Sequence, residues 1–300
     1  MISWLLVIVL AYLFFALSGF GDKLILQGPP KPISYTFWAG ILNILAIVII
    51  PFAGLEFPGI NLFFWIALDA IVFALGLYFG FSAVENFEVS KVAATIGAVQ
   101  PIFIFFISWG FWGYQALSFT NFIAFLLLFF GSVLISFDKK PELTTKYLKL
   151  TLLASLMYSL DYVLLKYIFE NFTFVQGFIW RSVLIALVVS VLLLKKSNRK
   201  EIFKKKNISN KKLEKTFFAT QTAGGIANIL QSFAISLAPV AFLPIVNSLR
   251  GLQYIFLFII TSFFTFFFPK ILKEKMSQKI VLRKLVSIFL IVFGLIVLIF

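Results

Sequence analysis

Four charged side chains lie inside long apolar stretches of the sequence: Asp69, Asp161, Arg181 and Arg250. An ionised group near the centre of a bilayer costs at least about 2.5 kcal/mol, so it is retained where it pairs with an opposite charge or contacts a ligand. An arginine can donate two parallel hydrogen bonds to a carboxylate or phosphate, and an aspartate can accept an amino group or a proton. We therefore regard these four residues as candidates for binding a small charged molecule.

The stretches that carry these charges are long enough to cross a membrane. A helix of about 20 apolar residues spans a hydrocarbon core of roughly 30 Å, and backbone groups in lipid must be satisfied within their own segment. We expect ten such helices, near residues 2–21, 33–53, 61–84, 92–112, 117–137, 149–168, 173–194, 216–237, 241–267 and 279–299. Each charge lies about eight to ten residues from one end of its helix, roughly 12 to 15 Å deep. The sequence therefore predicts four charges at one level, near the midplane.

The ten predicted helices fall into two successive sets of five, in residues 1–140 and 141–300. Phe37 to Ala39 in the second helix parallels Ile179 to Arg181 in the seventh. Because five is odd, the second set enters the membrane from the opposite side. The predicted fold is all-α, a polytopic membrane protein whose ten transmembrane helices form two inverted five-helix repeats, as is common in secondary transporters.

Composition leaves little room for a soluble domain or for enzyme chemistry. Hydrophobic residues make up 61% of the 300 residues, and the longest polar stretch, residues 195–215, is short and highly charged. The absence of Cys and His excludes disulfides, thiol chemistry and the usual zinc sites. We expect no enzyme activity and no cofactor.

The net charge of +14 is distributed as a membrane topology signal. Every Lys and Arg except Lys166, Arg181 and Arg250 lies in or beside an odd-numbered loop. Basic residues collect in cytoplasmic loops, so we expect the loop 195–215 in the cytoplasm and both termini outside the cytoplasmic membrane. This distribution argues against a nucleic-acid partner, whereas anionic membrane lipids are expected to contact the basic loop.

Polar side chains on several helices extend the candidate site. Amides have more donors and acceptors than helix packing requires, so these residues are expected to line a cavity. The additional candidates are Gln100, Asn228, Gln231, Asn247 and Tyr254. A proline inside a helix frees a carbonyl and allows a bend. Pro101 and Pro244 therefore mark either a hinge, a cavity wall or a plain kink.

A purely structural role for the charges is the alternative. Ion pairs of Asp161 with Arg181, or of Asp69 with Arg250, would hold helices together without contacting a ligand. Gly76 and Gly80 share a helix face and have the spacing of close helix packing.

The chain resembles the ten-helix, EamA-like branch of the drug/metabolite transporter superfamily. The resemblance rests on the five-plus-five duplication, on Ala83 to Pro101 and on its second copy, Ala234 to Tyr254. The family often closes each fourth helix with Gly-Glu. Here these positions read Gly113-Tyr114-Gln115 and Lys273-Glu274, so only Glu274 retains the acid. The resemblance implies an inverted-repeat bundle with a cavity between the third, fourth, eighth and ninth helices, used mostly to export amino acids, other metabolites or drugs.

We therefore expect a transporter of small polar or zwitterionic metabolites, such as amino acids, related compounds or drugs, that works by alternating access and exports its substrate. Arg250 would bind a carboxylate or phosphate, and Asp69 or Asp161 an amino group or a coupling proton. Facilitated diffusion stands beside proton coupling. The inverted repeat makes the two faces of the bundle nearly equivalent, so either direction of transport is mechanically available. A lipid-intermediate flippase of the same fold is the rival hypothesis. Ten helices suffice for a monomeric unit, so we expect a monomer.

Overall fold

The computed structural model describes residues 3–25, 31–87, 89–113, 119–136, 144–203, 211–267 and 278–299. All regular secondary structure in these ranges is helical. The predicted boundary between the two halves, residues 204–210 of the basic loop, and Gln115 and Glu274 lie outside the described residues.

Every predicted apolar stretch contains a helix or a short series of helices. The first half contains α1 (Ser3–Ile25), α2 (Pro32–Ile41), the 3-10 helix η1 (Leu42–Ile49), α3 (Ile50–Ala53), α4 (Ile60–Asn86), α5 (Val89–Trp112) and α6 (Phe119–Ser136). The second half contains α7 (Thr145–Asn171), α8 (Phe174–Ser190), η2 (Val191–Leu194), α9 (Lys196–Ile202), α10 (Lys211–Leu237), η3 (Val240–Phe242), α11 (Leu243–Ser248), α12 (Gly251–Phe267) and α13 (Gln278–Ile299).

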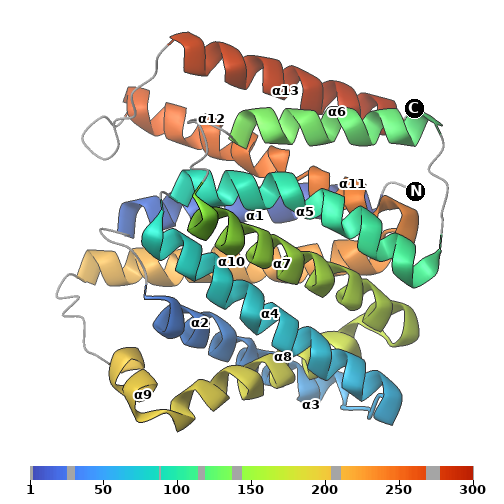
Figure 1. The fold of residues 1–300 in the computed structure, drawn as a ribbon, viewed down its shortest axis with the longest axis vertical. Coiled ribbons are helices and arrows are strands. Elements are labelled where there is room, and N and C mark those ends of the chain that lie inside the picture. Colours follow the sequence, from blue (N-terminus) through green and yellow to red (C-terminus); the bar gives the residue numbers. More distant parts are fainter. Residues whose placement is uncertain are drawn as a thin grey trace.

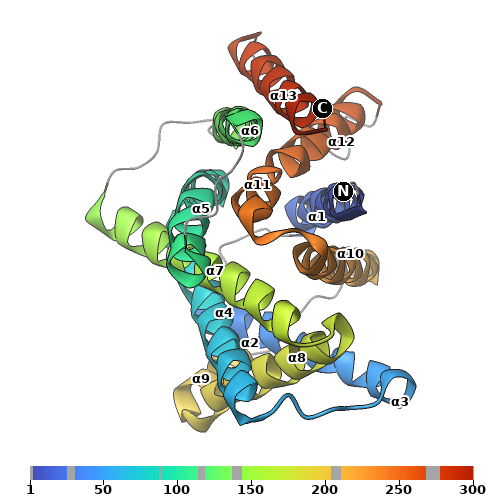
Figure 2. The same ribbon diagram turned by 90° about the vertical axis from the view of Figure 1, so that its right-hand side faces the viewer.

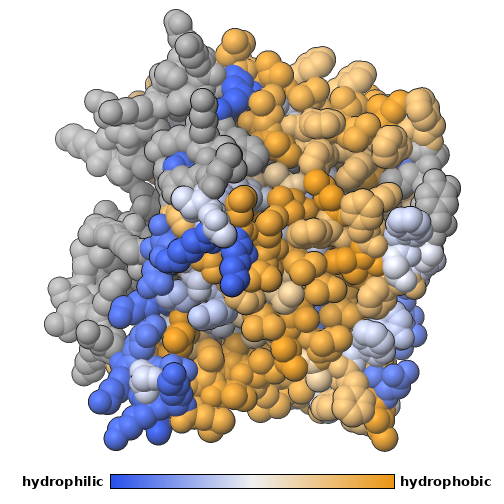
Figure 3. Space-filling view, viewed as in Figure 1, coloured by the Kyte–Doolittle hydropathy of each residue, from blue (hydrophilic) through white to orange (hydrophobic). Residues whose placement is uncertain are grey.

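The chain is a polytopic helical membrane protein by the length and composition of its helices. In the described residues, eight helical segments are long and apolar enough to cross a membrane, and α6 adds a shorter apolar helix. Hydrophobic residues form a broad band across the face shown in Figure 3, between polar margins at its left and right edges. The long helices run between these two margins (Figure 1).

The two ends of the bundle differ in charge. The basic end, at the left of Figure 1, carries α9 with its exposed Lys196, Arg199 and Lys200. The N- and C-terminal ends of the chain lie together at the opposite end, which we call the terminal end. This agrees with the prediction that both termini lie on one face and the basic loop on the other.

The long helices associate in two packing groups, each of which combines helices from both halves of the sequence. In the α1 group, α1 packs along α10 and also contacts α12. In the α4 group, α4 packs along α7 and α8, α5 packs on α7, and α2 packs on α4 and α8. The pair of α6 and α13 lies at one edge of the bundle, and α2, α4 and α8 lie at the other (Figure 2).

Small residues allow close helix contacts inside the α4 group. A Cβ atom added at Gly76 or Gly80 of α4 would lie 2.9 or 3.0 Å from the ring or hydroxyl of Tyr158 in α7. The prediction that these glycines serve close helix packing is confirmed.

The two prolines that were expected to mark a hinge, a cavity wall or a plain kink lie in different settings. Pro244 lies in the first turn of α11, where the missing N–H removes no helical hydrogen bond. The helix instead breaks after Ser248, where Leu249 and Arg250 form a turn before α12. In α5, the helical conformation continues through Pro101.

The second apolar segment contains an unusual helix. η1 has eight residues in the 3-10 conformation, whereas most runs of this type end after three or four. It packs against α8, and the amide of Gln176 in α8 donates to the carbonyl of Ala53 at 3.0 Å just beyond it. The segment is therefore attached to α8 at its far end.

Candidate functional site

Arg181 of α8 lies between two buried aspartates from neighbouring helices. Its Nε donates to Asp69 Oδ2 of α4 at 2.7 Å, and its Nη2 donates to Asp161 Oδ1 of α7 at 2.5 Å. The guanidinium also lies 4.8 Å from the ring centre of Phe73. These four residues, the Arg181 cluster, connect α4, α7 and α8 inside the bundle.

The charges of the Arg181 cluster do not cancel when both acids are ionised, because two carboxylates share one guanidinium. Asp69 is fully buried, and its Oδ1 has no hydrogen-bond partner in the described part of the chain. The Asp161 side chain keeps 12% of its surface exposed. The predicted ion pair of Asp161 with Arg181 is confirmed. The pairing of Asp69 with Arg250 is wrong, since Asp69 bonds to Arg181.

Arg250 occupies the break between α11 and α12, and its backbone shows how the break forms. Its N–H donates to the carbonyl of Asn247 at 3.0 Å, three residues back, instead of to Val246. The carbonyl of Val246 is thereby freed and accepts the hydroxyl of Tyr12 in α1 at 3.0 Å.

A second carbonyl is freed on the other side of the break. The N–H of Leu252 donates to Leu249 at 2.9 Å, so the carbonyl of Ser248 has no helical donor. The hydroxyl of Ser132 in α6 donates to it at 2.5 Å. Side chains of α1 and α6 thus satisfy a discontinuous helix, the type of element that forms ligand sites inside secondary transporters.

The side chain of Arg250 has a polar neighbour but no acidic one. Its Nη1 donates to Gln100 Oε1 of α5 at 2.9 Å. Among the described residues, no carboxylate lies within 4.0 Å of its guanidinium. Arg250 is only partly buried, and a Cβ added at Gly97 of α5 would lie 3.9 Å from its Cδ. This arginine therefore keeps donors that no carboxylate of the described residues occupies.

Tyrosines surround this arginine. Tyr12, Tyr158 and Tyr162 all interact electrostatically with Arg250, and the last two also interact with Asp161. Tyr254 of α12 donates its hydroxyl to the carbonyl of Ala93 in α5 at 3.3 Å. The same two tyrosines of α7 therefore lie within electrostatic reach of both Arg250 and the Asp161 carboxylate of the Arg181 cluster.

The remaining predicted amides are placed differently from one another. Gln231 interacts with the Tyr12 hydroxyl, which places it beside the break. Asn247 is 2% exposed, and its Oδ1 has no hydrogen-bond partner in the described ranges. Asn228 is exposed on α10 and donates to Gly224 of its own helix at 3.0 Å. The structure thus gathers Gln100, Gln231, Asn247 and Tyr254 near Arg250, but it does not bring Asn228 there.

Two features of the site were absent from the sequence-based candidates. Tyr12 and Ser132 support the helix break, although each stands among apolar residues with nothing in the local sequence to mark it. Lys166 of α7 is 5% exposed and donates to the carbonyl of Ser236 in α10 at 3.2 Å. The sequence indicated this contact only by placing a lysine near the end of a predicted apolar helix.

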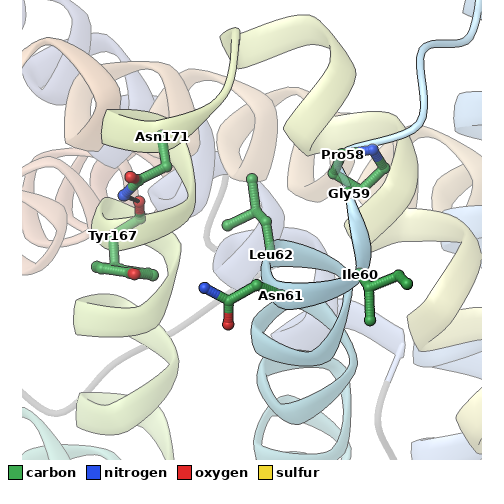
Figure 4. A pocket seen from close by; sticks show the side chains of 7 residues that line it. All are labelled: Pro58, Gly59, Ile60, Asn61, Leu62, Tyr167 and Asn171. Carbon is green, nitrogen blue, oxygen red and sulfur yellow. Dashed lines mark hydrogen bonds between the residues drawn. The ribbon is translucent and has the colours of Figure 1, made fainter.

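A separate hollow lies at the terminal end, away from both arginines. It has a volume of about 320 Å³ and is lined by Pro58, Gly59, Ile60, Asn61, Leu62, Tyr167 and Asn171. Figure 4 shows Asn61 of α4 facing Tyr167 and Asn171 of α7 across it. No charged side chain lines this hollow, so we do not regard it as the binding site.

Comparison with known proteins shows a similar fold. No protein-family profile matches the sequence, and no curated protein matches it. One solved structure, described only as "Crystal structure of protein", is similar with a TM-score of 0.70 over 98% of this chain and 95% of that chain. Its sequence identity is 15%, so the likeness concerns the fold alone.

Proposed function

We propose that this protein is a transporter of the cytoplasmic membrane, with ten transmembrane helices in two inverted five-helix repeats. By alternating access, it would export small polar or zwitterionic metabolites that carry a carboxylate or phosphate. The observation that carries this proposal is Arg250, a partly buried arginine in a helix break with no acidic partner in the described residues.

Helix packing supports the inverted repeat. An inverted repeat relates each predicted helix to the one five positions later or earlier in the chain, so α1 corresponds to α7 and α10 corresponds to α4. The two corresponding pairs, α1 with α10 and α7 with α4, both pack closely. By the same correspondence, the contact of α5 with α7 matches the contact of α12 with α1. The helices α6 and α13 correspond to each other, and they also form a pair. Together with the predicted ten spans, this pairing favours an EamA-like arrangement.

The two charged groups supply complementary chemistry for a zwitterion. Arg250 would bind the anionic group through its planar guanidinium, and Gln100 orients that guanidinium from α5. Asp161 is the more exposed acid of the Arg181 cluster, so we assign it the amino group or a coupling proton. The basic end would face the cytoplasm, since it carries α9.

The test is a thermal-shift panel on protein purified in detergent. Its ligands are amino acids, organic acids, nucleotide precursors, quaternary amines and lipid headgroup analogues. A ligand at 100 times its Kd adds about 2.7 kcal/mol to the unfolding free energy. One anionic class should raise the Tm of wild type and of Arg199→Ala, which removes an exposed arginine of α9, but not that of Arg250→Ala.

Arg250→Lys retains the charge but loses the planar fork, so it should give a reduced shift. An undiminished shift in Arg250→Ala would contradict the assignment of Arg250. A shift with lipid headgroup analogues alone would favour the flippase over a transporter of soluble metabolites.

A further inference from the structure

The two packing groups are joined at the terminal end by a lysine at a helix terminus. The Nζ of Lys166 in α7 donates to the carbonyl of Ser236, in the last turn of α10, at 3.2 Å. Carbonyls in the last turn of a helix have no helical donor, and Pro239 follows closely. A cation is also favourable at the carboxyl end of a helix dipole. Lys166 therefore caps α10 from the other packing group.

Neighbouring contacts strengthen this connection. Glu170, one turn after Lys166, lies 3.7 Å from its Nζ and accepts the indole N–H of Trp112 in α5 at 2.9 Å. The ring of Phe174 in α8 lies 5.0 Å from that of Phe233 in α10, between ring centres. Figure 1 shows α5, α7 and α10 all ending at this end of the bundle. Polar and aromatic contacts thus close α10 against the α4 group there.

The described residues show no equally extensive contact between the two packing groups at the basic end. In the proposed inverted repeat, the pair of α7 and α10 corresponds to the pair of α1 and α4. In the described part of the chain, α1 and α4 do not pack against each other to a comparable extent. Gln221, Gly225 and Asn228 are exposed along the part of α10 that leads to the basic end. Among the described residues, contact between the two packing groups is therefore more extensive for α10 with α7 at the terminal end than for the corresponding helices α1 and α4.

We propose that Lys166 and the carboxyl end of α10 form a reversible gate, which must separate before the Arg250 site can open to the terminal side. This inference rests on the proposed alternating-access function. Movement of α10 away from α7 would break the cap of Lys166 on Ser236 and separate Phe174 from Phe233. Lys166 is thus a gating residue that does not contact the substrate.

The chain has no Cys, so a single reporter cysteine can be introduced without first removing native cysteines. We would introduce Asn228→Cys on the exposed face of α10 and reconstitute the protein in vesicles. A membrane-impermeant maleimide is then applied to each side separately. In the Lys166→Met background, labelling from the terminal side should rise about tenfold, because a charge-assisted hydrogen bond that holds the closed state is lost. Ser236→Ala is the matched control, since it retains the backbone carbonyl and should leave labelling unchanged.

Equal labelling of wild type and Lys166→Met from both sides, with an unchanged Tm, would overturn the gate. Should Lys166→Met fail to fold, Phe174→Cys with Phe233→Cys tests the same gate with Lys166 in place. Cross-linking this pair should abolish terminal-side labelling of the reporter, and persistent labelling after complete cross-linking would overturn the proposal. Labelling requires no substrate, so the gate and the proposed function can be tested separately. If Lys166→Met changes the labelling but the protein transports none of the tested ligands, the proposed function is refuted and the gate is not.

Discussion

Arg181 and Arg250 were predicted to lie at the same depth, yet the protein surrounds them in opposite ways. Arg181 bonds to two carboxylates and contacts a phenyl ring, and its side chain is 7% exposed. Arg250 is more exposed and bonds to one neutral amide. One arginine has more protein anions than it can neutralise, and the other has none in the described residues.

The difference separates a structural charge from an available one. A buried arginine between two acids holds three helices together, and removing it leaves two carboxylates without a cation. An arginine fixed by a neutral partner keeps its positive charge for a molecule that enters the bundle. The burial of a charge in a membrane helix therefore does not by itself indicate a ligand site, and its partners decide the assignment.

The strongest test of this contrast is the loss of each arginine. Arg181→Leu should lower the free energy of unfolding by about 3 to 5 kcal/mol, because it leaves Asp69 and Asp161 buried and unpaired. Arg250→Leu should cost less than half as much, since it removes one hydrogen bond to a neutral group. Denaturant unfolding in detergent measures both.

Neutralising the whole Arg181 cluster is the control for that comparison. A triple variant with Asp69→Asn, Asp161→Asn and Arg181→Gln should regain a large part of the stability lost in Arg181→Leu. Similar unfolding free energies for the two single leucine variants would show that the arginines do not differ in the way described.

A smaller effect is expected from giving Arg250 a partner of its own. Gln100→Glu places a carboxylate where the amide oxygen now lies, 2.9 Å from Arg250 Nη1. An internal anion should weaken binding of the anionic ligand at least about tenfold while leaving the Tm equal or higher. Gln100→Met adds no charge and should weaken binding much less. Equal losses in both variants would mean that shape, not charge, controls the site.

The smallest expected effect concerns the helix break that positions Arg250. Tyr12→Phe and Ser132→Ala each leave one freed carbonyl without its donor, which should cost about 1 to 3 kcal/mol of unfolding free energy. The same two variants should also bind the ligand more weakly, because the position of Arg250 depends on the helix break. Tyr78→Phe, at an exposed tyrosine of α4, should change neither quantity. A stable variant with unaltered affinity would show that the break does not position the arginine.

The helices could be predicted from the sequence because long apolar stretches in lipid have few alternatives to helix. The four intramembrane charges were also visible, since each interrupts such a stretch. Their pairing was not visible: Asp69 and Asp161 lie on different helices, and sequence spacing does not reveal which arginine faces them. One of the two predicted pairings was therefore right and the other wrong.

The helix break at Arg250 was not predicted, for a related reason. Proline is the strongest sequence signal for an interrupted helix, so the hinge, cavity wall or kink was predicted at Pro244, six residues before Arg250. The actual break depends on hydroxyl donors from α1 and α6, which are distant in sequence. A local pattern cannot identify donors that arrive through tertiary packing.

The long 3-10 helix η1 has a mechanical consequence. A 3-10 helix rises about 2.0 Å per residue and an α-helix 1.5 Å, so converting its eight residues would shorten the segment by roughly 4 Å. The same conversion would rotate everything beyond it by about 160°, since the two helices turn by different angles per residue. Because Gln176 attaches α8 to Ala53, such a change in length would act directly on the helix that carries Arg181.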